Sequence, residues 1–267
     1  KFLSMLLALT ATASLAFAAT ETVDCGGSAT LNANPKTGYH FVRWEKNGVQ
    51  VSTSASYQVT NIQADASYTA IFAPNTNTPY TVKHYQQNLD GTYPAVATDV
   101  DNLTGITGAP TAAEAKSYTG FTKVNFDQGT IAADGSTVIT INYTRNTYAL
   151  SWVTDGDVLT GAYTSGQVLY GAAITAPNTP TKIGYTFAGW TPATSATMPA
   201  EATTYTATWT PATVHYTVKH WQQNLANDDY TEVVGDREDK TGTTGTNTVA
   251  AAKSYTGFNP KLFSQTS

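Results

Sequence analysis

Histidines are the residues of this sequence best suited to acid–base chemistry near neutral pH. There are four of them: His40, His84, His215 and His220. A catalytic histidine needs an orienting carboxylate and a nucleophile within hydrogen-bond reach, and the sequence contains no compact pattern of serine, histidine and aspartate. We therefore interpret the histidines as structural residues at strand ends and predict that the chain is not an enzyme.

Closely spaced carboxylates are the second candidate for chemistry, because they could bind a metal ion. Asp99 and Asp101 correspond to Asp236 and Glu238 in a second copy of the same segment. Oxygen ligands at alternate positions are typical of calcium-binding loops. The full spacing of such a loop is missing, so we interpret these groups as solvated loop carboxylates. The lone Cys25 excludes an intramolecular disulfide. We predict neither a metal site nor a cofactor.

The composition is that of a folded protein with few charges. Of 267 residues, 41% are hydrophobic and 11% aromatic, whereas only 12% are charged, about half of the roughly 25% that is usual in soluble domains. Lysine and arginine number 14 against 19 acidic residues, a formal net charge of -5. Without a run of basic residues the chain lacks the phosphate-neutralising surface that nucleic-acid binding needs, and we exclude nucleic acid as a partner.

The first 18 residues have the pattern of a secretory signal peptide. An initial Lys1 precedes an uncharged, mostly apolar run that ends in Ala16-Phe17-Ala18, a small-x-small triplet of the type that a signal peptidase cleaves after. A membrane anchor or a core helix is the alternative, but the run is short and is diluted by threonine and serine. We predict export, and we expect no membrane span beyond this segment.

Internal repeats make up the rest of the chain. The segment YTVKHYQQNL at 80–89 recurs as YTVKHWQQNL at 216–225. A weaker repeat, G-Y-x-F-x-x-W, occurs at 38–44 and 184–190. Two kinds of module therefore alternate after the signal peptide of residues 1–18, with predicted boundaries at 19–74, 80–145, 147–210 and 216–267.

Strands and turns dominate the local pattern. β-Branched and aromatic residues alternate with polar ones along several stretches, so that Tyr80, Val82 and His84 share one face of a strand. Asn-Gly and Asp-Gly dipeptides separate such stretches as hairpin or bulge turns. Only 111–116 and 248–253 have a helical composition, and these short segments would have to pack on a sheet to be stable. We predict a mainly β protein of the α+β class.

Aromatic residues divide into two groups. One group belongs to the core, because a small module needs large side chains to bury enough apolar surface. The other group is Tyr85 and Trp221, which strict alternation places on the outer face of their strands. There they either pack on a neighbouring module, or contact a glycan or protein ligand, or are turned inwards by a bulge. We assign to the core the aromatic residues of the G-Y-x-F-x-x-W segments: Tyr39, Phe41, Trp44, Tyr185, Phe187 and Trp190.

The modules resemble repeats of bacterial surface proteins. Residues 148–210, with PTKIGYTFAGW and the closing TYTATWT, resemble the internalin-type B repeat (the Listeria-Bacteroides repeat), and residues 23–72 resemble its divergent form. Residues 80–145 resemble the mucin-binding-protein (MucBP) repeat through their opening strand, the SYTGF segment and the closing VITINYTR. The resemblance implies small ubiquitin-like β-grasp modules, strung like beads on exported proteins.

The last module departs from the pattern of its earlier copy. It ends at Ser267, before any counterpart of residues 131–145, so the closing strand of its sheet is absent. A module without this strand exposes a sheet edge and part of its core. We expect either that the sequence is part of a longer protein or that the last module is poorly ordered.

These observations favour a non-enzymatic, secreted protein of the bacterial cell surface, associated with the wall. We expect an adhesin or stalk whose monomeric modules, in series, bind a host or environmental glycan or glycoprotein such as mucin weakly and multivalently. Tyr85 and Trp221 are the candidate contact residues. The alternatives are accessory repeats of a surface enzyme whose catalytic domain lies outside this sequence, and pure spacing without a ligand.

Overall fold

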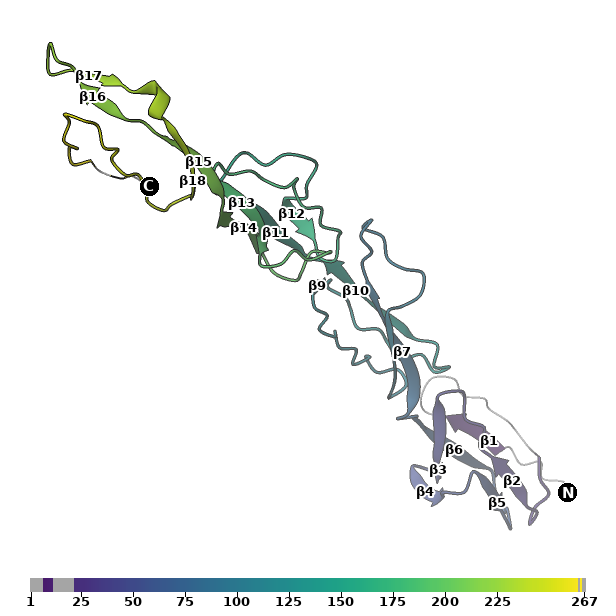
Figure 1. The fold of residues 1–267 in the computed structure, drawn as a ribbon. Coiled ribbons are helices and arrows are strands. Elements are labelled where there is room, and N and C mark those ends of the chain that lie inside the picture. The colour runs from purple at the N-terminus through teal and green to yellow at the C-terminus, as the bar shows by residue number, and fades with distance from the viewer. Residues whose placement is uncertain (1–6, 12–21, 264, 266–267) are drawn as a thin grey trace. The chain divides into compact units, whose positions relative to one another are not determined.

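The computed structural model describes residues 7–11, 22–263 and 265. By its internal contacts the chain divides into two compact units, residues 1–145 and 146–267. Among the described residues nearly all regular structure is β strand, and the exception is a short 3-10 turn at Val234–Asp236 (Figure 1). The prediction of a mainly β protein is confirmed, whereas the β-grasp topology stays a prediction.

The described residues of the first unit form three sheets. One sheet has the strand order β1-β6-β3-β4, a second pairs β2 with β5, and the third has the order β8-β7-β10-β9. Among these described strands, no sheet mixes the modules predicted at 19–74 and 80–145. The strands are β1 (Leu7–Ala11), β2 (Ala29–Asn32), β3 (Tyr39–Lys46), β4 (Val49–Ser52), β5 (Ser56–Val59), β6 (Ala66–Pro74), β7 (Thr78–Gln86), β8 (Asp99–Gly105), β9 (Phe121–Lys123) and β10 (Val138–Arg145).

The described residues of the second unit also form three sheets. A four-stranded sheet has the order β12-β11-β14-β13, and two smaller sheets pair β15 with β18 and β16 with β17. The last module therefore has two short hairpin-like sheets where the second module has a single sheet of four strands. The strands are β11 (Thr147–Val153), β12 (Gly166–Leu169), β13 (Tyr185–Thr191), β14 (Thr203–Pro211), β15 (Thr213–Val218), β16 (Trp221–Gln223), β17 (Tyr230–Glu232) and β18 (Glu238–Thr243).

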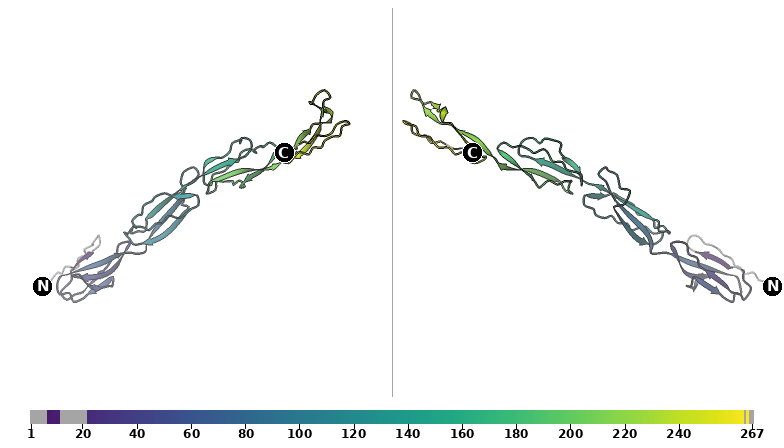
Figure 2. Two further views of the ribbon diagram at one scale, coloured as in Figure 1. Left: turned by 90° about the vertical axis from the view of Figure 1, so that its left-hand side faces the viewer. Right: turned by 45° about the vertical axis from the view of Figure 1, so that its right-hand side comes forward.

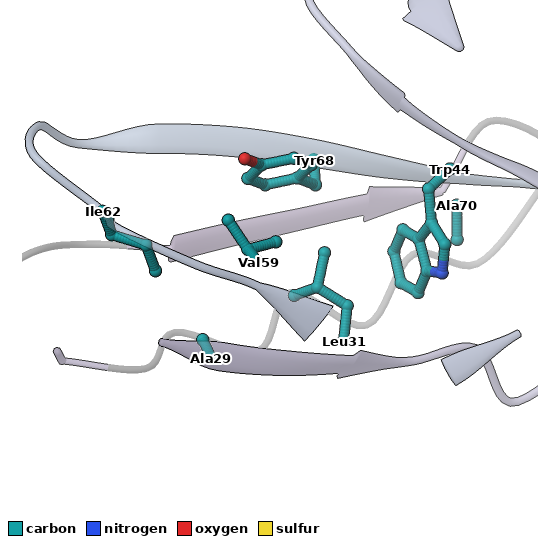
Figure 3. Close-up of a cluster of buried hydrophobic side chains, with 7 residues drawn as sticks. All are labelled: Ala29, Leu31, Trp44, Val59, Ile62, Tyr68 and Ala70. Carbon is teal, nitrogen blue, oxygen red and sulfur yellow. The ribbon is translucent and has the colours of Figure 1, made fainter. Parts of the chain in front are cut away.

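The core of the first module lies between the β2–β5 pair and strands β3 and β6. Figure 3 shows apolar side chains of both layers pointing toward one another, with Leu31 on one side and Trp44 and Tyr68 on the other. Trp44 is completely buried. Its indole Nε1 has no hydrogen-bond partner among the described residues, so this side chain stabilises the module through apolar packing.

A β-bulge explains the spacing of the G-Y-x-F-x-x-W segment. In a regular strand, residues three apart point to opposite faces, yet the ring centroids of Phe41 and Trp44 are 5.6 Å apart. The register of β3 against β6 shifts just after Phe41, which adds one residue and returns Trp44 to the face of Phe41. The same shift follows Phe187 in β13, where the ring centroids of Phe187 and Trp190 lie 5.4 Å apart.

Strand β1 lies within the predicted signal peptide and is one of the strands of the first sheet. It pairs in parallel with β6, from Leu7 opposite Ala66 onward, as β11 pairs in parallel with β14 in the second unit. The predicted cleavage site, Ala16 to Ala18, lies outside the described residues. Removal of the first 18 residues would leave β6 without β1 on this edge.

The prediction of a helix at residues 111–116 is wrong. This segment has no helical structure, and side chains distant in sequence satisfy its backbone groups. The Gln128 side chain accepts a hydrogen bond from Ala113 N–H at 2.9 Å and donates one to Ala113 C=O at 2.8 Å. Tyr80 Oη accepts a hydrogen bond from Ala112 N–H at 3.1 Å. These bonds to Tyr80 of β7 and to Gln128 take the place of the hydrogen bonds of a helix that would be too short to be stable alone.

The prediction of a helix at residues 248–253 is wrong for the same reason. The segment is not helical, and Tyr216 takes the role that Tyr80 has in the earlier copy. Its Oη accepts a hydrogen bond from Val249 N–H at 3.0 Å and lies 2.9 Å from Val249 C=O. Both copies therefore hold an irregular segment over the sheet through a tyrosine hydroxyl.

A glycine lies at the junction between the two modules of each unit. In the first unit Gly38 C=O accepts a hydrogen bond from Asn75 N–H at 2.8 Å, and Asn75 C=O accepts one from Thr107 N–H at 2.9 Å. The connector is therefore bonded to the modules on both sides of it. The second unit repeats both bonds, at 2.8 and 2.9 Å, through Gly184, Ala212 and Thr244.

We expect Gly38→Ala to destabilise the first unit more than Gly48→Ala does. Both glycines have a positive φ, 81° and 76°, so each substitution costs roughly 1–2 kcal/mol of backbone strain. A Cβ at Gly38 would also lie 2.7 Å from the Ala133 side chain, whereas nothing lies within 4 Å of a Cβ at Gly48. Thermal unfolding of the two variants measures the difference, and equal losses would contradict the close packing of Gly38 on Ala133.

Candidate functional site

His84 lies at the centre of a buried polar network in the second module. Its side chain is completely buried on the face of β7 that also carries Tyr80 and Val82. Nε2 is 3.1 Å from Asp101 Oδ2, and Nδ1 is 2.8 Å from Tyr143 Oη. Because a carboxylate only accepts hydrogen bonds, the tautomer that satisfies both contacts has the proton on Nε2 and accepts a hydrogen bond from the Tyr143 hydroxyl at Nδ1.

Lys116 joins two carboxylates of β8 to this network. Its Nζ lies 2.6 Å from both Asp99 Oδ2 and Asp101 Oδ1. These hydrogen bonds hold the pKa of both aspartates below the usual value and raise the pKa of Lys116, so all three groups are charged at neutral pH. The prediction that these carboxylates lie in a loop is wrong, because both aspartates lie on β8. Their side chains stay 44% and 32% exposed while they pair with this lysine.

Tyr143 on β10 connects the histidine to the segment that carries Lys116. Its Oη accepts a hydrogen bond from Lys116 N–H at 2.8 Å. The ring is almost fully buried and meets Tyr118 edge-on, with centroids 4.8 Å apart. Burial raises the pKa of Tyr143, and burial also raises the pKa of Tyr118 to about 12. One hydroxyl thus ties β10 both to β7 and to the irregular segment above the sheet.

In this network the Asp101 carboxylate lies beside His84, but neither ring nitrogen of His84 is free to contact a substrate. Both ring nitrogens of His84 are bonded within the protein, whereas a general base needs a nitrogen within reach of the substrate proton. The sequence alone does not join Asp101 to His84, because the two residues are 17 positions apart and meet through the pairing of β7 with β8. Mutually satisfied polar groups of this kind favour one packing of a core.

The last module repeats this network in part. His220 is buried, and its Nε2 is 2.9 Å from Glu238 Oε1. Lys253 Nζ lies 3.3 Å from Asp236 Oδ1, and Tyr255 donates a hydrogen bond to Asp236 Oδ2 at 2.7 Å. This bond to the carboxylate raises the pKa of Tyr255 to about 12. Among the described residues, His220 Nδ1 makes no counterpart of the bond between His84 Nδ1 and Tyr143.

A groove of about 560 Å³ lies beside the repeated network. Residues 218–223 line it on one side, and residues from 250–263 line it on the other. The yellow C-terminal segment lies beside β16 and β17 without forming a strand of its own (Figures 1 and 2). Trp221, one of the two predicted contact residues, is among the residues that line the groove.

The two predicted contact residues differ in exposure. Tyr85 is half-buried on β7, on the face opposite His84, with Asn142 of β10 as its cross-strand neighbour. Its counterpart Trp221 is 53% exposed. They belong to different units, so each is a candidate contact of its own module.

The aromatic residues assigned to the first core lie at different depths. Trp44 is fully buried, and Phe41 packs against the same cluster while partly exposed. Tyr39 is half-buried at the start of β3 and is not part of that cluster. The bulged half of the motif therefore supplies the core, and its tyrosine lies at the margin.

In the third module the aromatic residues of the G-Y-x-F-x-x-W segment are only half-buried, and other residues form the buried core. Trp190 is half-buried, with its ring centroid 4.8 Å from that of Trp152 and 5.4 Å from that of Phe187. Tyr185 is half-buried, and Lys182 Nζ lies 4.7 Å from the centre of its ring. The sequence interpretation did not assign several residues that form the cores. Two of them, Tyr68 and Tyr205, lie in the alternating segments SYTAIF and TYTATWT, and this alternation could have identified them. The missing large residues are Tyr68, Tyr143, Trp152, Met198 and Tyr205.

Neither a membrane-spanning helix nor a metal cluster is seen in the described part of the chain. No helix there is long and apolar enough to cross a bilayer. No group of three or more His, Cys, Asp and Glu side chains there is placed to hold a metal ion. Cys25 is exposed, with Sγ 3.4 Å from Gln63 Oε1.

Two parts of the chain match known repeat families. Residues 6–76 match the family described as the divergent InlB B-repeat domain, and residues 148–215 match the Listeria-Bacteroides repeat domain. Repeats of the Listeria-Bacteroides kind occur in bacterial surface proteins. Both predicted B-repeat resemblances are confirmed, whereas neither match covers 80–145 or 216–267, where the MucBP resemblance stays a prediction. None of the curated proteins matches the chain.

Proposed function

We propose that the chain is a non-enzymatic repeat protein of the bacterial cell surface, in which MucBP-like modules alternate with B repeats as a stalk or adhesin. The observation that carries this proposal is the pair of repeat matches at 6–76 and 148–215. Three separate hydrophobic clusters, one in each of the first three modules, support it, because modules with their own cores can be added in series. We also propose the β-grasp fold for these modules.

Export to the surface is part of the proposal. The apolar run of residues 1–18 and its small-x-small end support a cleaved signal peptide. The pairing of β1 with β6 then belongs to the unprocessed chain. Association with the cell wall is the location that we propose for the mature protein.

A glycan or glycoprotein such as mucin is the ligand class that we propose. The exposed indole of Trp221 and the half-buried ring of Tyr85 are amphipathic surfaces of the type that contacts sugars and extended peptides. A charged content of 12% gives little nonspecific electrostatic attraction. Each module would bind weakly, and serial modules would gain avidity by multivalency.

The double variant Tyr85→Ala/Trp221→Ala tests the assigned contacts. We expect it to lose at least about tenfold in apparent affinity for immobilised mucin, equivalent to about 1.4 kcal/mol, while its thermal unfolding stays unchanged. Tyr163→Ala is the matched control, because Tyr163 is an exposed tyrosine, 37% accessible, that is assigned no contact. Binding that survives the double variant would contradict the assignment, and no binding to mucin or to a glycan array would reduce the modules to spacers.

A further inference from the structure

The first and last strands of the second module are paired with each other in parallel. The chain enters this module at β7 and leaves it at β10, and residues 138–143 of β10 pair with residues 81–86 of β7. In the sheet order β8-β7-β10-β9 these two strands are the central ones. One row of backbone hydrogen bonds therefore joins the two strands through which the module is connected to the rest of the chain.

The third module has the same arrangement, although its sequence is that of a different repeat. Its first strand β11 pairs in parallel with its last strand β14, with residues 150–153 opposite residues 203–206. Both strands are again central, in the order β12-β11-β14-β13. The hydroxyl oxygens of Ser151 and Thr204 lie 2.7 Å apart across the pair. A side-chain hydrogen bond is therefore added to the backbone bonds between these strands.

Tension along the chain would load such a parallel pair in shear. Thr81 near the start of β7 lies opposite Val138 at the start of β10, so the entry of the chain at Thr78 and its exit at Arg145 are at opposite ends of the pair. A pull on the chain therefore slides β7 along β10. Sliding has to break several hydrogen bonds in one step, whereas peeling two neighbouring strand ends apart breaks the bonds one after another.

Further hydrogen bonds strengthen this pair at its ends. At the exit end the Gln87 side chain accepts a hydrogen bond from Arg145 N–H at 3.1 Å, and Gln87 C=O accepts one from Arg145 Nε at 3.1 Å. Gln87 N–H donates to Tyr143 C=O at 2.9 Å. At the entry end Thr81 N–H donates to Thr137 C=O at 2.9 Å. The pairing therefore extends beyond the six residues of its register.

The core covers one face of the paired strands. Val82 and His84 of β7 and Ile141 and Tyr143 of β10 are each at most 1% exposed. Water has no access to the strands from this face, so a backbone bond that breaks there does not at once gain a water molecule as its new partner.

We propose that the second and third modules bear tension through these paired terminal strands, which act as a mechanical clamp. A module keeps its length under load until its first and last strands slide past each other. This role goes beyond that of a spacer, which only has to be long. It depends on neither export nor glycan binding, because it follows from the strand pairing inside each module.

Single-molecule force measurements on the full chain, with two attachment geometries, test the clamp of the second module. Both geometries share Asn77→Cys, at an exposed residue just before β7, and Cys25→Ser, which removes the exposed native thiol. The second attachment is Thr144→Cys near the end of β10 or Val138→Cys at its start, and both of these residues are exposed. The first pair of attachments slides the strands, and the second pair peels them apart.

At the same force we expect the module to survive at least about tenfold longer under sliding than under peeling, a difference equivalent to about 1.4 kcal/mol. Forced unfolding is governed by the unfolding rate in the direction of the pull. Denaturant unfolding has no direction, so the two variants should agree in it. Equal lifetimes in the two geometries would overturn the proposal, and so would a longer lifetime under peeling.

Gln87→Ala tests a single contact of the clamp. It removes the acceptor of Arg145 N–H, so we expect the lifetime under sliding to fall about threefold or more, as for the loss of one hydrogen bond. The lifetime under peeling should not change, because peeling begins at the other end. The matched control is Gln86→Ala, since the Gln86 side chain forms no hydrogen bond among the described residues. A loss that is equal in both geometries would contradict the place of Gln87 in the clamp.

The same comparison in the third module tests whether the clamp is shared. Thr147→Cys at the start of β11 is combined with Thr210→Cys near the end of β14 for sliding, or with Glu201→Cys just before β14 for peeling, and all three residues are exposed. Sliding should again give the longer lifetime, and equal lifetimes would reject the clamp in this module. Mucin binding of the Tyr85→Ala/Trp221→Ala variant is measured without force, so the failures of the two proposals are distinguishable.

Discussion

Trp44→Ala is expected to lower the free energy of unfolding of the first module by about 3–5 kcal/mol, the usual cost of removing a buried tryptophan. The side chain is completely buried between the two layers of its module. A domain of this size has a total stability of about 5 kcal/mol, so the variant should keep no more than about 2 kcal/mol and should unfold at a much lower denaturant concentration. Denaturant unfolding of the full chain, followed by near-ultraviolet circular dichroism, measures the loss.

Two further variants make the Trp44 prediction specific. Val49→Ala on the adjacent β4, where the side chain is 66% exposed, should change stability by no more than about 0.5 kcal/mol. Trp44→Phe should cost less than Trp44→Ala, because the indole N–H makes no hydrogen bond among the described residues and a large apolar ring is kept. Equal losses for the phenylalanine and alanine variants would contradict a role based on apolar volume.

Tyr143→Phe is expected to destabilise the second module by about 3 kcal/mol, although it removes a single oxygen atom. The substitution leaves two groups without their partner, His84 Nδ1 and Lys116 N–H. Each unpaired buried group costs roughly 1–3 kcal/mol. Denaturant unfolding gives the total, and faster hydrogen exchange at Lys116 N–H should accompany it.

Tyr85→Phe is the matched control for the Tyr143 variant. It removes the same atom from a half-buried tyrosine next to the last residue of β7, and no described hydrogen bond involves its hydroxyl. We expect unchanged stability for this variant. If Tyr143→Phe were no more destabilising than Tyr85→Phe, the hydroxyl would not hold the network together.

Local features of the fold could be predicted from the sequence because they depend on neighbouring residues. The Asn47-Gly48 turn forms with a positive φ at both positions, 51° and 76°, as the small side chains of these residues allow. Alternation correctly placed Tyr80, Val82 and His84 on one buried face of β7. The internal repeat by itself makes His220 equivalent to His84, and both side chains are buried.

The candidate site depends on partners that no local pattern contains. Ala113 lies in a segment of helical composition, yet the Gln128 side chain, 15 residues away, binds both of its backbone groups. Asp101 meets His84 through the register of β7 against β8. Such contacts require two distant segments to be placed side by side, and neither segment by itself specifies which partner it meets.

The amino-acid sequence alone determined the strands, the turns, the alternation of modules and the equivalence of their copies, since each follows from residue type and spacing along the chain. The tertiary structure alone decided the bulge that turns Trp44 onto the face of Phe41 and the meeting of His84 with Asp101 across β7 and β8. Both depend on strand register, and register is set by packing between segments far apart in the sequence.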